Sequence, residues 1–204
     1  MKLKQLESAI QEICETLDFN KSAQIQLEQY STPPRLAAEF LLSIQDDITN
    51  NTVIDLGCGC GVLSAGISIL GCAFLYCFDI DSNCLNLTKE HLTQADINAE
   101  YIQCDIEKLN LKKFADVVIT NPPFGTRKPG IDWTFVQKGL EMANLVYSFH
   151  KSSTRKGLMK KANEEGVRAE VFMTVNFELP KMYKVHKQKS VGVEVDIWRF
   201  SKAN

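Results

Sequence analysis

Residues 52–61 read TVIDLGCGCG, an apolar run followed by three glycines at alternate positions. The run from Thr52 to Leu56 is short and partly β-branched, so it predicts a buried strand. Alternate glycines let the backbone turn sharply and approach a ligand closely, and the free N–H groups of the next helix, expected from about Val62 to Leu70, then point at that ligand. The stretch predicts a strand, a ligand-binding turn and a helix, which together form the first unit of an α/β fold.

Three further predicted strands end in a polar residue in the same way. The strands expected at 74–78, 99–104 and 115–120 are followed by Asp79, Asp105 and Asn121, as Asp55 closes the first. Because the carboxyl ends of parallel strands meet at one edge of a sheet, the four side chains are expected there together. An acid after the second strand is well placed to accept both ribose hydroxyls of a nucleoside, which is the role expected of Asp79.

Asn121, Pro122, Pro123 and Phe124 form the most distinctive of these strand ends. Two consecutive prolines hold φ near about −65° and stiffen the turn, so the amide oxygen of Asn121 is a fixed hydrogen-bond acceptor. Phe124 adds a flat apolar face beside it. The four residues suit a planar substrate with an NH2 group, such as adenine, although a strand-to-loop turn capped by a packed Phe explains them equally well.

The first 50 residues predict a helical cover on the sheet. Apolar residues recur every three or four positions from residue 3 to residue 17, the stripe of an amphipathic helix. Thr32 can cap a second helix that has Pro33 in its first turn and Leu36 and Phe40 on its buried face. Farther along, Ser82 is the expected cap of the helix after Asp79.

The segment after Phe124 is expected to continue the α/β pattern. Residues 125–132 predict a loop, either a mobile one over a substrate or a plain surface loop. A helix from Trp133 to Tyr147 and a short strand at 146–149 follow, then His150, for which a hydrogen-bonded structural role is expected rather than that of a catalytic base. A basic helix ends near Gly166, and alternation in 170–179 and 191–200 predicts an antiparallel hairpin.

Composition limits the classes of function. With 204 residues, of which 45% are hydrophobic and 24% charged, the chain has room for a single α/β domain spanning residues 1–204. It has no run of about 18 apolar residues, so no membrane span is expected. The seven cysteines form no Cys-x-x-Cys pair, which indicates neither a disulfide framework nor a zinc site. An odd number of thiols fits a reducing compartment, so the nucleus and the cytoplasm are the expected locations.

Basic residues gather in two stretches although the net charge is −2, which argues against coating nucleic acid by bulk electrostatics. Solvated surfaces are the ordinary explanation of such stretches. The alternative is that they bind RNA phosphates. The residues expected to do so are Lys151, Arg155, Lys156, Lys160, Lys184 and Lys187.

Several of these stretches resemble the motifs of known enzymes. Asn-Pro-Pro-Phe at 121–124 is similar to the catalytic signature of S-adenosylmethionine-dependent amino methyltransferases, Asp-x-Gly-x-Gly-x-Gly at 55–61 to motif I of Rossmann-like methyltransferases, and Gln-Tyr-x-Thr-Pro at 29–33 to an N-terminal motif of adenine-specific members. With His-Lys-Ser-Ser-Thr-Arg at 150–155, their order resembles that of the eukaryotic small-subunit ribosomal RNA adenine N6-methyltransferases of the methyltransferase-like family.

The resemblance implies a fold, a cofactor and a partner. The fold is a seven-stranded Rossmann-like sheet, mostly parallel with an antiparallel last strand and helices on both faces. The partner is a small zinc-binding activator subunit that extends the sheet at an exposed edge to form a heterodimer. The implied contacts of S-adenosyl-L-methionine are Gln29, Thr32, Asp55, Gly57, Gly59, Cys60, Asp79, Asp105 and Ile106.

The resemblance also assigns roles within the site. Gln29 and Thr32 would hold the methionine end of the cofactor, and Asp105 and the Ile106 amide its adenine. The Asn121 side-chain oxygen and the Pro122 carbonyl would accept the two amino hydrogens of the substrate. Two alternatives stay open. One is glutamine N5-methylation of a protein, whose Asn-Pro-Pro pocket more often ends in Tyr, and the other is a cofactor-binding scaffold without catalysis.

Overall fold

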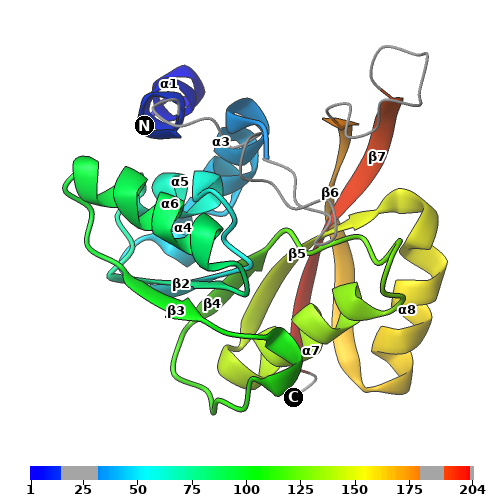
Figure 1. The fold of residues 1–204 in the computed structure, drawn as a ribbon. Helices are drawn as coiled ribbons and strands as arrows, with labels where there is room; N and C mark the ends of the chain where they lie inside the picture. Colours follow the sequence, from blue (N-terminus) through cyan, green and yellow to red (C-terminus); the bar gives the residue numbers. More distant parts are fainter. Residues whose placement is uncertain (15–31, 180–190, 203–204) are drawn as a thin grey trace.

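A seven-stranded sheet forms the centre of the molecule, in a computed structural model that describes residues 1–14, 32–179 and 191–202 (Figure 1). The strand order is β3-β2-β1-β4-β5-β7-β6. The strands are β1 Thr52–Leu56, β2 Phe74–Asp79, β3 Glu100–Gln103, β4 Val117–Thr120, β5 Leu145–Lys151, β6 Val167–Leu179 and β7 Val191–Lys202. Strands β1 to β5 pair in parallel, whereas β7 runs antiparallel to both β5 and β6. The predicted sheet, its antiparallel last strand and the C-terminal hairpin are confirmed.

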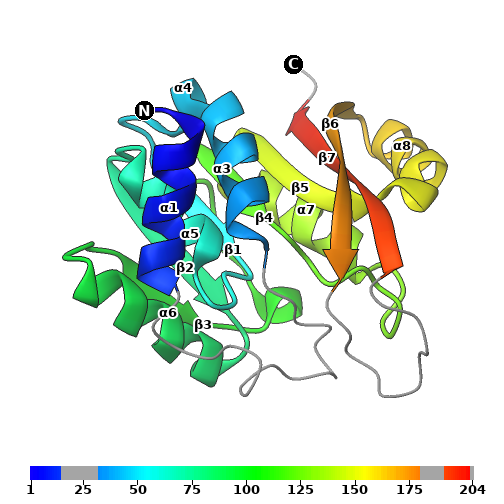
Figure 2. The same ribbon diagram turned by 90° about the horizontal axis from the view of Figure 1, so that it is seen from above.

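Helices cover both faces of this sheet, as Figure 2 shows from above. The helices are α1 Leu3–Cys14, α3 Pro34–Ser43, α4 Gln45–Ile48, α5 Val62–Ile69, α6 Ser82–Gln94, α7 Ile131–Met142 and α8 Arg155–Glu164, with 3-10 turns η2 Ile106–Lys108 and η3 Ser152–Thr154. Buried residues of α1, α3, α5 and α6 share one core cluster, and those of α7 and α8 share another.

Neighbouring strand residues divide between the two clusters. Val53 and Val117 join the cluster under α1, α3 and α5, whereas Ile54 and Val118 join the one under α7 and α8. Side chains alternate across a strand, so a central strand covered on both faces is expected to be apolar along most of its length. This explains the apolar character of β1 and β4, in which Asp55 and Thr120 are buried polar residues near the carboxyl ends.

Two predictions of helix caps are wrong. Thr32 does not cap α3, because Pro33 occupies the cap position and no side-chain cap bond forms there. Asp81, not Ser82, caps α6 by accepting the Asn83 N–H.

The helix predicted from Trp133 to Tyr147 ends at Met142, and β5 already begins at Leu145. Residues 145–147 pair with β4 on one side and β7 on the other. Hydrogen bonds to two neighbouring strands therefore prevail over the helical spacing of the apolar residues. The predicted extension of the first helix to residue 17 lies outside the described residues.

In the described part of the chain, no helix combines the length and the apolar character needed to cross a membrane.

Candidate active site

The four polar strand ends meet at one edge of the sheet, as predicted. Asp55 in β1 pairs in register with Cys77 and Ile119, and Asp79 ends β2 opposite Gln103 of β3. Asn121 directly follows β4, and Asp105 comes two residues after β3. The parallel register therefore brings residues from four separate chain segments to the same side.

The glycine turn between β1 and α5 is held from several directions. Gly57, Gly59 and Gly61 have φ values of 79°, 54° and 83°, a region that favours glycine. The N–H of Gly59 donates to Asp79 Oδ2 at 2.8 Å, and its carbonyl accepts from Thr88 Oγ1 at 2.6 Å. A Cβ built on Gly59 would meet no atom within 4 Å, so this glycine faces open space. The turn is a rigid cradle that is open on one side.

Two residues that support the cradle were missed by the sequence analysis. Thr88 contacts Gly59, and His91 Nδ1 lies 3.0 Å from the Cys60 carbonyl oxygen. Both are buried, three residues apart on the face of α6 that packs on the sheet. Polar residues on an otherwise apolar helix stripe were the signal that could have identified them, because buried polar groups need hydrogen-bond partners.

Asp55 is fully buried beneath the cradle. Its Oδ2 accepts a hydrogen bond of 2.5 Å from Ser64 Oγ in α5, and burial raises its pKa to about 7. Its Oδ1 has no hydrogen-bond partner among the described residues. The observed contact ties β1 to the helix that follows the turn, and direct ligand contact by Asp55 stays a prediction.

Asp79 and Asp105 both accept hydrogen bonds from backbone N–H groups near the strand ends. Asp79 Oδ1 accepts the Asp81 N–H at 2.9 Å in addition to the Gly59 bond, and burial raises the pKa of Asp79. Asp105 Oδ1 accepts the Glu107 N–H at 3.1 Å and so caps η2, where Ile106 is buried. The two carboxylates therefore lie at the end of β2 and just beyond β3, at the places expected for ribose and adenine contacts.

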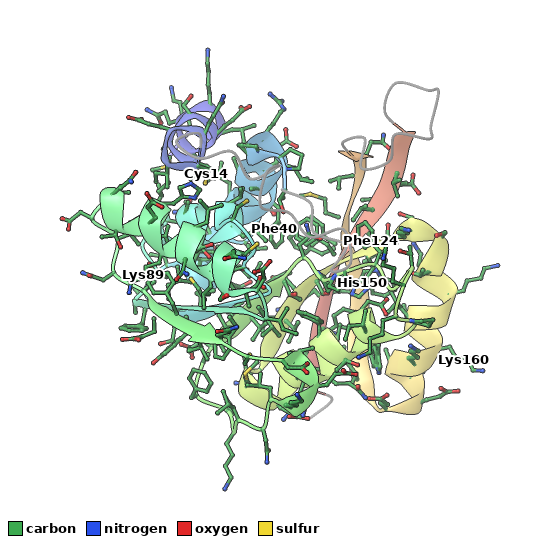
Figure 3. The ribbon with its side chains drawn as sticks, in the orientation of Figure 1. Cys14, Phe40, Lys89, Phe124, His150 and Lys160 are labelled. Atoms are coloured by element: carbon green, nitrogen blue, oxygen red, sulfur yellow. The ribbon has the colours of Figure 1, made fainter. Side chains whose placement is uncertain are left out.

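The Asn-Pro-Pro-Phe turn is fixed to two other parts of the molecule. Asn121 Nδ2 donates to Thr32 Oγ1 at 3.0 Å, and Thr120 Oγ1 donates to the Leu56 carbonyl at 2.6 Å. Phe124 packs against the core cluster under α1 and α3, and Lys151 Nζ lies 5.3 Å from its ring centroid. Figure 3 shows Phe124 on the same side of the molecule as His150. The structure thus brings Thr32 of the N-terminal motif to the Asn121 turn.

The basic residues expected to contact RNA have different surroundings. Arg155 binds Asp196 through two hydrogen bonds, from Nε to Oδ2 at 2.7 Å and from Nη2 to Oδ1 at 2.6 Å. Lys160 lies 3.7 Å from Glu164 on the outer side of α8 and, like Lys156, is exposed (Figure 3). Arg155 therefore has a structural partner, whereas the two lysines face solvent. Gln29, Lys184 and Lys187 lie outside the described residues.

Asp196 is a fully buried carboxylate whose contacts extend beyond Arg155. It also accepts hydrogen bonds from Ser152 Oγ at 2.8 Å and Thr174 Oγ1 at 2.9 Å. Burial alone would raise its pKa, but the bonds from Arg155, Ser152 and Thr174 hold it below the usual value. The carboxylate joins β7 to η3, α8 and β6.

The chain matches a known family and has relatives that align over nearly its whole length. Residues 35–144 match the family model of the methyltransferase small domain. The chain is 44% identical to the rRNA N(6)-adenosine-methyltransferase METTL5 of Danio rerio, an alignment covering 98% of this chain and 99% of the relative. It is 38% identical to the rRNA N(6)-adenosine-methyltransferase Mettl5 of Drosophila melanogaster, over 98% of this chain and 96% of that one.

A solved structure agrees over the whole length. A protein of Pyrococcus horikoshii, described as a candidate RNA methyltransferase, superposes with a TM-score of 0.86 at 32% identity, covering 100% of this chain and 99% of that one. The similarity therefore includes the N-terminal cover and the C-terminal hairpin, as well as the central sheet.

Proposed function

Because the chain belongs to the METTL5 family of rRNA N(6)-adenosine-methyltransferases, we propose that it transfers a methyl group to the N6 amine of an adenosine in small-subunit ribosomal RNA. The observation that carries the proposal is the position of Asn121. It follows β4 at the same sheet edge as the glycine cradle, and Thr32 fixes its amide.

The proposed cofactor is S-adenosyl-L-methionine, which when bound supplies a methyl group already activated by the adjacent sulfonium. The residues present fit this cofactor. The open side of Gly59 leaves room for a ligand on the cradle, and the carboxylates of Asp79 and Asp105 follow neighbouring strands, where they would contact ribose and adenine. Thr32 would then stand between the cofactor's methionine end and the Asn121 turn.

Asn121 and Pro122 would act on the substrate amine. An adenine amine is a poor nucleophile because its lone pair is delocalised into the ring. Asn121 Nδ2 donates to Thr32, so the amide is oriented with Oδ1 on the other side, as an acceptor for the amine. With the Pro122 carbonyl as second acceptor, the turn would favour the pyramidal amine and the charge that develops on attack. The protein mainly supplies alignment, and no strong base is required.

Phe124 and Lys151 would hold the target base. A base must leave its stack to reach the turn, at a cost of a few kcal/mol in a paired helix. Stacking on an aromatic ring returns about 1–3 kcal/mol. Lys151 Nζ, 5.3 Å from the Phe124 ring centroid, would supply a positive charge beside an extruded nucleotide. An unpaired or weakly paired adenosine is therefore the preferred target.

The exposed lysines Lys156 and Lys160 of α8 would add to this basic surface. They would bind RNA phosphates without reading the base, and the same role is proposed for Lys184 and Lys187. Arg155 would support this surface through Asp196. Contacts of this kind position RNA, while the Asn121 turn selects the amine.

The proposal includes a small zinc-binding activator subunit, supported by an apolar surface beside the β3 edge. Phe74 is 39% and Phe114 41% exposed, and both rings contact Tyr76, with centroid distances of 4.8 and 5.1 Å. Clustered exposed aromatics are typical of protein interaction sites, and β3 is a terminal strand of the sheet. Location in the nucleus and the cytoplasm is also proposed, consistent with seven free thiols.

The test is transfer of labelled methyl from S-adenosylmethionine to separate ribosomal RNA, tRNA and protein fractions, with and without the activator. Label in small-subunit ribosomal RNA is the expected result. Label confined to protein would replace the proposal with glutamine methylation, and cofactor binding without label in any fraction would indicate a scaffold.

A further inference from the structure

His150 and Asp132 form a buried pair at the active edge of the sheet. His150 Nδ1 lies 3.3 Å from Asp132 Oδ2, and the two side chains are 0% and 14% exposed. His150 is near the end of β5, and Asp132 is the second residue of α7. The pair therefore connects the sheet to the helix that begins where the loop after Phe124 ends.

The loop from Gly125 to Gly130 folds back on itself. A Cβ on Gly125 would lie 3.2 Å from the Lys128 carbonyl oxygen, 3.6 Å from the Gly130 nitrogen and 3.8 Å from Asp132 Oδ1. Asp132 is thus close to the residue that directly follows Phe124. A contact that fixes Asp132 fixes both ends of this loop.

The end of β5 contacts the loop region on both faces of the sheet. His150 and Lys151 are consecutive strand residues, so their side chains point to opposite faces. His150 binds Asp132 on the α7 side, and Lys151 lies over the Phe124 ring on the other. The loop also has an exposed ion pair, Lys128 with Glu107 of η2. Exposed pairs contribute little, which leaves the buried pair as the stronger anchor.

We propose that His150 is a positioning residue of the methyl-transfer site, which acts through Asp132 to hold the loop that carries Phe124. This rests on the proposed function for its catalytic consequence. His150 does not serve as the base, because its Nε2 is buried and has no hydrogen-bond partner among the described residues.

The charges around the pair suit a neutral imidazole that donates to a carboxylate. Asp132 of α7, Asp196 of β7 and Lys161 of α8 act on His150. Burial lowers the pKa of His150 despite the two carboxylates. Burial is the largest single influence on Asp132 and opposes its ionisation, but the bond from His150, the Trp133 N–H and nearby positive charge together hold the pKa of Asp132 below the usual value. At neutral pH, Nδ1–H therefore faces an ionised Asp132.

The test compares His150→Leu, which removes the donor, with His150→Asn, whose amide N–H can take the place of Nδ1–H. Asp132→Ala removes the acceptor and keeps the histidine. Tyr147→Phe is the matched control, because it removes side-chain hydrogen bonding from the same strand, including the bond to Asp47 at 2.7 Å. Amide hydrogen exchange of residues 125–131, the Kd of S-adenosylhomocysteine, and kcat and KM on ribosomal RNA are measured for each.

The expected result is faster exchange of 125–131 and a kcat lowered at least ~10-fold in His150→Leu and Asp132→Ala, since small displacements of a positioning group are costly. KM and the Kd of S-adenosylhomocysteine stay unchanged, His150→Asn recovers both losses, and Tyr147→Phe shows neither. Wild-type exchange and kcat in His150→Leu would overturn the inference, as would faster exchange throughout the chain without recovery by Asn. If wild-type protein transfers no methyl to RNA but the exchange pattern holds, the proposed function fails and the loop anchor stands.

Discussion

Thr32 Oγ1 lies 3.0 Å from Asn121 Nδ2, although 89 positions separate the two residues in the sequence. The bond joins the segment in front of α3 to the turn after β4. It also determines which side of the Asn121 amide is the donor and which is the acceptor. Thr32 therefore links the part of the chain expected to hold the cofactor to the part expected to hold the substrate.

Thr32→Val keeps the shape of the side chain and removes the hydroxyl. A net hydrogen bond contributes about 0.5–1.5 kcal/mol, so kcat should fall about 2- to 10-fold as the Asn121 amide loses its fixed orientation. Thr32→Ser, which keeps the hydroxyl, should retain nearly wild-type kcat. Steady-state kinetics on RNA check this, and equal rates for Val and Ser would show that the bond does not matter.

Gly59→Ala and Gly71→Ala form a matched pair for the cradle. Both glycines have positive φ, 54° and 80°, and a Cβ at either would meet no atom within 4 Å. Backbone strain should lower the free energy of unfolding by about 1–2 kcal/mol in each. Only Gly59→Ala should weaken S-adenosylhomocysteine binding, because its methyl group would enter the proposed cofactor space. Calorimetric Kd values that rise equally in both variants would contradict this placement.

The buried Asp55 carboxyl predicts a pH dependence of stability. Burial raises its folded-state pKa from 3.8 to about 7, so the folded state binds the proton more tightly than the unfolded chain. Its unfavourable contribution is then complete above pH 7 and is relieved as pH falls from 7 toward 3.8. The Tm of the wild type minus that of Asp55→Asn should therefore increase as the pH is lowered from 8 to 5. A difference independent of pH would show that Asp55 is ionised throughout.

The sequence was sufficient to predict the sheet and its active edge. Largely apolar runs such as Val53–Leu56 are typical of strands in a parallel sheet that is covered on both faces, and a polar residue at or near the end of each run predicts the common edge. Contacts between distant segments could not be predicted, because no local pattern encodes them. The bond from Thr32 to Asn121 and the pair of His150 with Asp132 depend on how β4, β5 and α7 pack.

Local signals also failed where tertiary contacts outweighed them. Thr is a residue type that often caps helices, but the Thr32 hydroxyl accepts a hydrogen bond from Asn121 and Pro33 occupies the cap position. Residues 143–147 continue the apolar spacing of α7, yet pairing with β4 and β7 makes Leu145–Tyr147 part of a strand. Arg155 resembles the neighbouring lysines in sequence, and only the fold brings Asp196 against it.

Arg155 and Lys156 should respond differently to removal of their charge. Arg155→Ala leaves the buried Asp196 without its cationic partner, so Tm should fall. Lys156→Ala should leave Tm unchanged and weaken RNA binding, with the slope of log K against log salt reduced by about 0.7–0.9 for one lost phosphate contact. Thermal unfolding and salt titrations check both. An unchanged slope in Lys156→Ala would remove this residue from the RNA surface.

The most direct test of methyl transfer at the Asn121 turn is mass spectrometry of nucleosides from small-subunit ribosomal RNA after reaction with wild type and Asn121→Ala, each with the activator. We expect N6-methyladenosine with the wild type. Asn121→Ala should give at least ~100-fold less N6-methyladenosine, because losing one group that stabilises developing charge typically lowers the rate by this much. The Kd of S-adenosylhomocysteine should stay unchanged. Equal N6-methyladenosine from both proteins would contradict the role of Asn121 and the account built on it.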